Sequence, residues 1–268
     1  MELKFALPPA GFKRLFYDIE TSPNIGLFWK SGYKLTIDPS NIIQERAIIC
    51  ICWKWEGQKE VHSVSWDKGC DKAALSLFME EALKADECVG HNGDNFDEKW
   101  IRTRCLLHSI PCPAKLDSLD TLKKARTHFN FNSNKLDYIA KYLGLEGKIE
   151  TSYGLWKDIL LKNCDEAMDK MVTYCKQDVE VLEQVFHRLQ PFINHNHHAG
   201  EHDGFGRYSC PKCGNDKPQY QKMRITKAGV RRHQLLCLKG CGYFTTSNAV
   251  WMKKIEADMI EKASNRAN

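Results

Sequence analysis

Short apolar runs in the first part of the chain predict β-strands. Residues 14–20 read RLFYDIE, an apolar run that ends in acids, and residues 47–55 read AIICICWKW. A shorter run follows at 60–65, and another, ECVG, occupies 87–90. Runs of this length, rich in β-branched and aromatic residues, are typical of strands. We expect the first three to form a meander.

Helical spacing takes over further along the chain. Apolar residues recur every three or four positions over 73–85, 94–107 and 137–143. The longest helix is predicted over 165–189, where apolar side chains form a broad face and Pro191 follows the end. Strands that give way to helices in this manner indicate a mixed α/β fold.

A polar segment divides the chain near residue 200. Residues 194–206, NHNHHAGEHDGFG, are rich in His and Gly and lack periodicity, which is typical of a linker. The predicted domains are therefore 1–193 and 207–268. In the second domain we expect short strands and turns, followed by an amphipathic helix from Asn248, its N-cap, to about Ser264.

Composition excludes several classes of protein. Of 268 residues, 43% are hydrophobic and 27% are charged, which is close to a globular average and allows a proper core. No apolar run approaches the ~20 residues of a membrane-spanning helix, and the N-terminal sequence lacks a secretory signal. We therefore expect a cytoplasmic protein with no membrane partner and with 12 reduced cysteines. Eight of these are scattered, mostly among apolar neighbours, as expected for small buried hydrophobes, and four are grouped.

Charge is unevenly distributed. The net charge is +5, but residues 201–268 hold 13 basic and 6 acidic residues, whereas residues 1–200 hold 26 basic and 28 acidic residues. A near-neutral body with a basic C-terminal part suggests catalysis in the first and polyanion binding in the second.

Acidic residues at particular positions suggest a metal centre. Asp18 and Glu20 lie two apart on a predicted strand, so both side chains point to one face. Like charges this close raise each other's pKa unless a cation lies between them, and a hard divalent metal is the natural partner. Asp97 follows the fourth predicted strand, and Asp178 lies one helical turn after Tyr174 on the longest helix.

Three motifs in order resemble those of a known nuclease superfamily. FYDIET, GHNGDNFD and YCKQD are similar to the three exonuclease motifs of the DEDD superfamily, and the Tyr-x-x-x-Asp form of the last resembles its tyrosine subclass, DEDDy. The histidine subclass has His where Thr173 stands. LDSLDTL and KLDYIAKYLGL resemble connecting segments of the predicted-exonuclease branch often found in phages, so that the resemblance covers about 12–193 and would place the protein in a host cytoplasm.

This resemblance implies a ribonuclease H-like fold, a mixed sheet flanked by helices, and a 3′–5′ exonuclease. Four carboxylates would gather two Mg²⁺ or Mn²⁺ ions, which can hold both the attacking and the leaving oxygen of a phosphodiester. Asp18 would bridge both ions, Glu20 and Asp178 would complete the site of the ion that binds the water, and Asp97 would hold the second ion. Tyr174 would orient the water, because a phenol with a pKa near 10 is a poor base.

Several functions remain open at this point. Single-stranded DNA with a free 3′ end is the favoured substrate. RNA 3′ trimming is an alternative, because the acids do not distinguish the sugar, and a structure-selective endonuclease is another. A nucleic-acid-binding adaptor with a vestigial site is disfavoured, because all four acids and the tyrosine are present. Protein partners are not predicted.

Substrate contacts are expected near the acids. Asn92 resembles a supporting residue of the second motif that would hydrogen-bond near the site, with Phe96 packing beside it. The insert between Thr21 and Arg46 interleaves aromatic residues with lysines, which could stack unpaired bases and contact phosphates, or could pack onto the body instead. These residues are Phe28, Trp29, Lys30, Tyr33 and Lys34.

Four grouped cysteines predict a structural Zn²⁺. Cys210-x-x-Cys213-Gly and Cys237-x-x-x-Cys241-Gly have the spacing of two zinc knuckles, and four thiolates close the coordination sphere. We therefore expect a small C-terminal Cys₄ zinc ribbon without hydrolytic activity. The loop between the knuckles is basic, which favours nucleic-acid binding over a stabilising cap or a protein-docking module. Its basic residues are Lys217, Lys222, Arg224, Lys227, Arg231 and Arg232.

Overall fold

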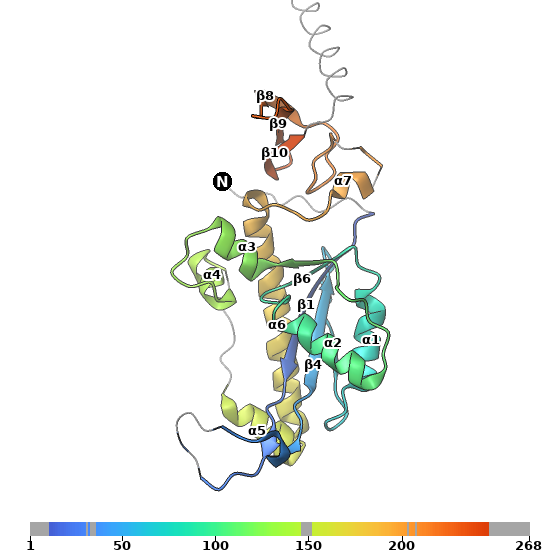
Figure 1. The fold of residues 1–268 in the computed structure, drawn as a ribbon, viewed down its shortest axis with the longest axis vertical. Helices are drawn as coiled ribbons and strands as arrows, with labels where there is room; N and C mark the ends of the chain where they lie inside the picture. The colour runs from blue at the N-terminus through green and yellow to red at the C-terminus, as the bar shows by residue number, and fades with distance from the viewer. Residues whose placement is uncertain are drawn as a thin grey trace, which may run out of the picture. The chain divides into compact units, whose positions relative to one another are not determined.

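The structure is a computed structural model that describes residues 11–30, 32, 36–145, 152–202, 204–206 and 208–246. The chain divides into two compact units (Figure 1). We call Lys13–Phe186 the body. The C-terminal unit comprises Met1–Phe12 and His187–Asn268, of which we discuss only the described residues.

A five-stranded mixed sheet forms the centre of the body, with strand order β5-β4-β1-β6-β7. Strands β1, β4 and β5 are antiparallel, which confirms the predicted meander, whereas β6 runs parallel to β1 and β7 parallel to β6. The sequence did not reveal β7, because three residues carry too little pattern. The strands are β1 Arg14–Thr21, β4 Ile48–Trp55, β5 His62–Ser65, β6 Glu87–Gly90 and β7 Ser118–Asp120.

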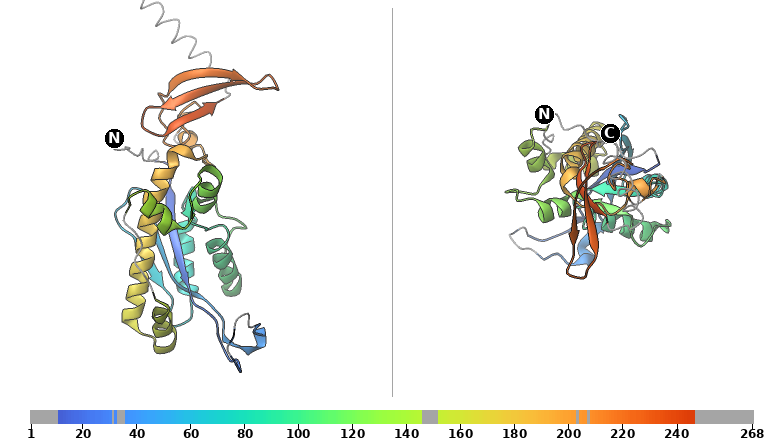
Figure 2. Two further views of the ribbon diagram at one scale, coloured as in Figure 1. Left: turned by 90° about the vertical axis from the view of Figure 1, so that its left-hand side faces the viewer. Right: turned by 90° about the horizontal axis from the view of Figure 1, so that it is seen from above.

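Helices cover both faces of this sheet. α6 lies along one face, and α1 and α2 lie on the other (Figures 1 and 2). Of the six helices α1–α6 in the described residues, four match predicted segments to within three residues at each end, and α6 matches at both ends. The helices are α1 Lys72–Ala82, α2 Asp97–His108, α3 Thr121–His128, α4 Leu136–Tyr142, α5 Tyr153–Lys162 and α6 Asp165–Leu189.

Alternation along β1 decides which side chains face which helix. Leu15, Tyr17 and Ile19 join a buried cluster with residues of α1 and α2. The residues between them point the other way, because successive strand side chains alternate between faces. Phe16 accordingly packs against Phe186 of α6, with 5.3 Å between the ring centroids. Asp18 and Glu20 share the face of Phe16 and therefore point to the α6 side.

The insert after β1 forms a small hairpin of its own. Strands β2, Ile25–Gly26, and β3, Ile42–Gln44, pair antiparallel, and a single 3₁₀ turn, Pro39–Asn41, precedes β3. The base of the insert is tied to the body by the indole of Trp156 on α5, which donates a hydrogen bond to the carbonyl of Thr21 at 3.0 Å.

The C-terminal unit holds an antiparallel sheet of order β10-β9-β8, formed by β8 Gln219–Ile225, β9 Arg231–Cys237 and β10 Gly242–Thr246. The segment predicted as a linker contains a one-turn helix, α7, Ala199–His202. The Ala199 N–H donates to the carbonyl of Pro211 at 2.8 Å, so this segment packs against the first knuckle. The domain boundaries stay a prediction, and the predicted helix from Asn248 lies outside the described residues.

Among the described residues, no helix has the length and apolar character required to cross a lipid bilayer.

Candidate active site

Three carboxylates meet between β1 and α6. Asp18 and Glu20 point from β1, and Asp178 is buried on the facing side of α6. One oxygen from each lies within 4.8 Å of the others. Carboxylate oxygens are the ligands that Mg²⁺ and Mn²⁺ prefer, and three acids at this spacing repel one another without a cation. The cluster therefore fits a divalent metal ion.

The fourth predicted acid, Asp97, lies next to this cluster but not within it. Asp97 begins α2 and is buried, and it accepts a hydrogen bond from the backbone N–H of Ile19, the residue between Asp18 and Glu20. Burial, together with the carboxylates of Asp120 and Glu20, raises the pKa of Asp97 to about 8. A buried carboxyl group close to other acids must either be protonated or lie beside a cation. Either state is compatible with a position at the edge of a metal centre.

A tight turn places Asp97. A Cβ at Gly90 would lie 3.2 Å from the Cα of Gly93, so the two ends of the turn approach closely only because both are glycine. Asn92, between them, has a φ of 70°. Its N–H donates to Asp120 Oδ1 at 3.0 Å, and the same oxygen accepts from Leu122 N at the start of α3. Asp120 thus ends β7 and caps α3.

His91 has partners that the sequence did not suggest. Its Nδ1 lies 2.9 Å from Thr121 Oγ1, and its Nε2 lies 2.9 Å from the carbonyl of Asn134. The ring therefore connects the turn after β6 to the segment before α4.

Tyr174 is buried on α6, one turn before Asp178. Residues four apart on a helix lie on the same face, so its side chain and that of Asp178 extend from one side of α6, as the motif predicts.

Thiols lie around the acids. Cys52 is the cross-strand neighbour of Asp18, and Cys50 is that of Glu20. Cys175 of α6 donates hydrogen bonds to the carbonyl of Asp18 at 3.5 Å and to its Oδ2 at 3.7 Å. All three cysteines are fully buried, as expected of small hydrophobes, but the contact of Cys175 with an acid of the cluster was not predicted.

A pocket of about 580 Å³ opens over the cluster and is lined by Asp18, Asp178 and Asn92. Much of its wall comes from the end of α3 and the loop before α4, which sequence reasoning missed. A polar loop carries no periodic signal, and only the run NSNK directly before a helix hinted at it. The missed lining residues include Arg126, Asn132, Ser133, Asn134 and Lys135.

The aromatic side chains of the insert project into solvent. Phe28 is 57% exposed and Trp29 is fully exposed, so these two rings do not pack onto the body. Phe96 is 40% exposed and lies 6.2 Å from the ring of Trp100, centroid to centroid. Tyr33 and Lys34 lie outside the described residues.

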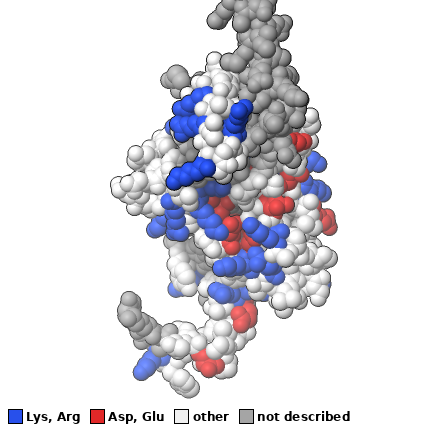
Figure 3. All heavy atoms as spheres, turned by 45° about the horizontal axis from the view of Figure 1, so that its top comes forward, with Lys and Arg blue, Asp and Glu red and all other residues white. Residues whose placement is uncertain are grey.

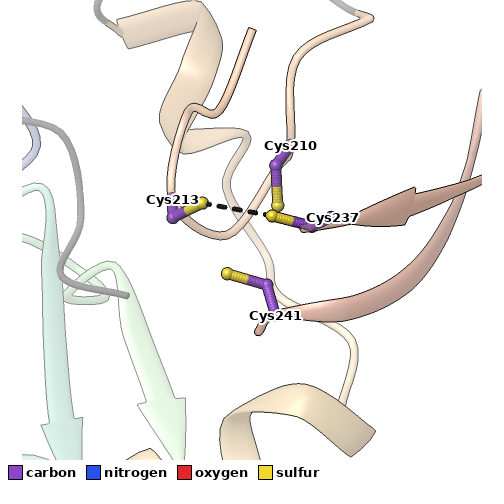
Figure 4. A group of neighbouring side chains, drawn as sticks. All are labelled: Cys210, Cys213, Cys237 and Cys241. Atoms are coloured by element: carbon purple, nitrogen blue, oxygen red, sulfur yellow. Dashed lines mark hydrogen bonds between the residues drawn. The ribbon is translucent and has the colours of Figure 1, made fainter. Parts of the chain in front are cut away.

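The four grouped cysteines converge in the C-terminal unit, and their sulfurs point toward one another (Figure 4). All four are buried, and Cys213 Sγ lies 3.6 Å from Cys237 Sγ. Four thiolates about 2.3 Å from a tetrahedral Zn²⁺ would stand ~3.8 Å apart, so the cluster fits that ion. The Nδ2 of Asn215 donates to Cys237 Sγ at 3.7 Å and thereby orients one sulfur.

Hydrogen bonds among these four thiols shift their pKa values in opposite directions. The other thiols lower the pKa of Cys213 and of Cys237 and raise the pKa of Cys210 and of Cys241. Four adjacent groups cannot all ionise unless a cation offsets their charge. The spacing of the four sulfurs likewise fits a bound cation.

Basic side chains lie on strands β8 and β9 of this unit and in the turn between them. Arg224 of β8 and Arg231 and Arg232 of β9 are exposed, as are Lys222 and Lys227. On the face drawn in Figure 3, basic and acidic side chains stand in adjacent groups rather than evenly mixed.

Comparison with known families identifies the class of fold. The sequence model described as RNase_H superfamily matches residues 43–190, more than half of the chain. The chain therefore belongs to the RNase_H superfamily. The match includes Asp97, Tyr174 and Asp178 but begins after Asp18 and Glu20. No curated protein matches the chain.

Among solved structures, the chain is similar to the family B DNA polymerase from the hyperthermophilic archaeon Pyrobaculum calidifontis, with a TM-score of 0.51 and 14% identity. The similarity covers 82% of this chain but only 31% of the polymerase chain. At this identity the similarity establishes the fold alone, and it agrees with the expected mixed sheet flanked by helices.

Proposed function

We propose that the protein is a metal-dependent 3′–5′ exonuclease that hydrolyses phosphodiester bonds at 3′ ends, with single-stranded DNA as the favoured polymer. Membership of the RNase_H superfamily supports a nuclease in general. The observation that carries the proposal is the meeting of Asp18, Glu20 and Asp178 within 4.8 Å, beside a pocket that Asp18 and Asp178 line.

The acids would hold two Mg²⁺ or Mn²⁺ ions. Asp18 would contact both, Glu20 and Asp178 would complete one site, and Asp97 would hold the other from the start of α2. When bound, such a pair lowers the pKa of a water and offsets the charge that develops on the phosphate oxygens. This assignment fits an acid cluster whose members lie on two rigid elements, β1 and α6.

The other side chains of the pocket would bind and orient the substrate. Tyr174 would hydrogen-bond the attacking water without removing its proton. Arg126 and Lys135 are exposed at the pocket wall and would contact backbone phosphates, and Asn92 would hydrogen-bond the terminal nucleotide. Phe28 and Trp29 project from the insert that follows Glu20, where they would stack on unpaired bases.

The C-terminal cysteines would hold one Zn²⁺ with a structural role. Cys210, Cys213, Cys237 and Cys241 offer four thiolates, which leave no coordination position for water. Hydrolysis is therefore assigned to the body alone, and the basic strands of the C-terminal unit are assigned to nucleic-acid binding.

A time course on 5′-labelled single-stranded DNA and RNA of one sequence tests the proposal, with Mg²⁺ or Mn²⁺ present. We expect a ladder that shortens from the 3′ end on DNA. Asp18→Asn should slow it by on the order of a thousandfold, because several kcal/mol of transition-state stabilisation are lost. Glu80→Gln, which removes an exposed acid of α1, is the matched control and should be fully active.

Other outcomes would replace the proposal. Faster cleavage of RNA would indicate an exoribonuclease, and internal cuts in structured DNA would indicate an endonuclease. Binding without cleavage of any strand would indicate an adaptor.

A further inference from the structure

Among the described residues, the hairpin formed by β8 and β9 extends past Thr246, the last described residue of β10. β10 pairs with β9 from Cys237 to His233, whereas β8 pairs onward to Arg231. Within the described residues, the end that contains Arg224 and Arg232 is therefore only two strands wide, and Figure 2 shows it projecting from the unit. Its turn is closed by the N–H of Thr226, which donates to the carbonyl of Val230 at 2.9 Å.

This two-stranded end carries an unfavourable arrangement of charge. Arg224 lies directly opposite Arg232 in the β8–β9 register, and both side chains are exposed. Like charges directly opposite each other across a ladder destabilise the pair. Lys222, Lys227 and Arg231 add to the same field, and Asp216 is the one acid between the two cysteine pairs. A bound polyanion would remove the repulsion.

The same end of the hairpin exposes apolar side chains, which contribute no burial free energy while they face solvent. Met223 is 41% exposed, Ile225 61% and Val230 45%. The β8 side chains from Gln221 to Ile225 are exposed on both faces of the ribbon. Because strand side chains alternate, Met223 and Ile225 lie on one face of the ribbon, and the paired Arg224 and Arg232 lie on the other. An apolar face backed by long basic side chains suits a ligand with an apolar interior edge and an anionic border.

B-form DNA has both features. Its major groove, about 12 Å wide, admits a two-stranded β-ribbon and presents thymine methyl groups to apolar side chains, while phosphates line both rims. The major groove of A-form RNA is deep and narrow and does not admit side chains in this way. The width of the groove, together with the charge and the apolar side chains of the hairpin, therefore favours duplex DNA over duplex RNA.

We propose that the β8–β9 hairpin enters the major groove of duplex DNA, with Arg224 and Arg232 on phosphates and Ile225 and Val230 against base edges. This proposal rests on the proposed function: the substrate would be a single-stranded 3′ end that extends from a DNA duplex, with the duplex held by the hairpin.

Binding by the full chain tests the hairpin separately from catalysis. In an Asp18→Asn background, fluorescence anisotropy would compare a short DNA duplex with an RNA duplex of the same sequence, at several salt concentrations. We expect the DNA duplex to bind about tenfold more tightly or better. Arg224→Ala with Arg232→Ala should weaken DNA binding and reduce the slope of log affinity against log salt by about 2, since each phosphate contact contributes about 0.9.

Two further variants separate insertion from general attraction. Ile225→Ser with Val230→Ser should weaken binding to the DNA duplex by about tenfold with the salt slope unchanged, because the lost contacts are apolar. Lys72→Ala with Lys239→Ala removes the same two charges away from the hairpin and should leave affinity nearly unchanged. Thermal unfolding would confirm that each variant is folded.

The outcomes also separate this proposal from the proposed function. Equal binding of both duplexes, or an equal loss in the lysine control, would overturn hairpin insertion even if the wild type degrades single strands. Tight duplex-DNA binding that depends on the hairpin, combined with no cleavage by the wild type, would support insertion and overturn the exonuclease.

Discussion

The thiol of Cys175 donates a hydrogen bond to the carboxylate of Asp18, with 3.7 Å between Sγ and Oδ2. The same sulfur lies 3.5 Å from the backbone carbonyl of Asp18, so one α6 side chain contacts both ends of that residue. Cys52, opposite Asp18 on β4, donates to the carbonyl of Val172 at 3.8 Å and joins β4 to α6. Asp18 is thus held in place from the helix as well as from the sheet.

Replacing Cys175 should reduce activity without unfolding the protein. Cys175→Ala removes a hydrogen bond with a net value of about 1 kcal/mol, so we expect a roughly fivefold lower kcat and a weaker apparent affinity for Mn²⁺. Titration of cleavage with Mn²⁺ would measure both. Cys105→Ala, at an equally buried cysteine of α2, is the control for the cavity that each substitution leaves. Equal effects of the two variants would show that Cys175 does no more than pack.

The sequence predicted much of this arrangement and missed the rest for identifiable reasons. β1 and α6 have strong periodic patterns, and the spacing of Asp18 with Glu20 follows from strand alternation alone. Nothing local indicates that Asp120, at the end of a three-residue strand, accepts hydrogen bonds from Asn92 and from the first turn of α3. Contacts of this kind join segments far apart in sequence, and only the fold brings them together.

Replacing Tyr17 with Phe should make the protein more stable. Its hydroxyl is buried with no hydrogen-bond partner among the described residues, and burial raises its pKa well above the usual value for tyrosine. Because an unsatisfied buried hydroxyl is destabilising, Tyr17→Phe should increase the free energy of unfolding by about 1 kcal/mol. Urea denaturation would measure the change. A loss of similar size would show that the hydroxyl has a partner.

A double-mutant cycle would locate this effect. A Cβ at Gly93 would lie 3.3 Å from the Tyr17 hydroxyl and 3.3 Å from the Cα of Gly90. Gly93→Ala should therefore be destabilising, and less so in the Tyr17→Phe background, which relieves the first contact but not the second. Additive effects would place the strain in the backbone contact alone.

Lys212 should be essential to the C-terminal unit although it is not a metal ligand. Its buried Nζ donates to the carbonyls of Gln190 at 2.8 Å, Pro191 at 2.7 Å and Cys241 at 3.0 Å. Lys212→Met keeps the apolar stem but leaves these acceptors unsatisfied, so we expect that unit to lose about 3 kcal/mol of stability and to release zinc more readily. Calorimetry and a chelator assay would measure the two effects.

The matched control for Lys212 lies in the second knuckle. Lys239 is exposed between Cys237 and Cys241, so Lys239→Met removes the same charge near the same cluster without removing a buried donor. It should leave both the unfolding transition and the zinc release rate almost unchanged. If both methionine variants release zinc equally fast, the ammonium acts through charge and not through its three carbonyl contacts.

Because the aromatic side chains of the insert are exposed, their effect on DNA binding can be measured without a change in protein stability. Trp29→Ala removes a ring that contacts solvent, so the free energy of unfolding should not change, whereas affinity for single-stranded DNA should fall about tenfold if one base stacks on it. Leu27→Ala removes another side chain of the same segment, 70% exposed, that lacks an aromatic face, and should keep full affinity. Anisotropy with labelled oligonucleotides measures both. A Trp29 variant that is less stable but binds normally would show that the ring packs onto protein in solution, and base stacking would then have to be assigned elsewhere in the insert.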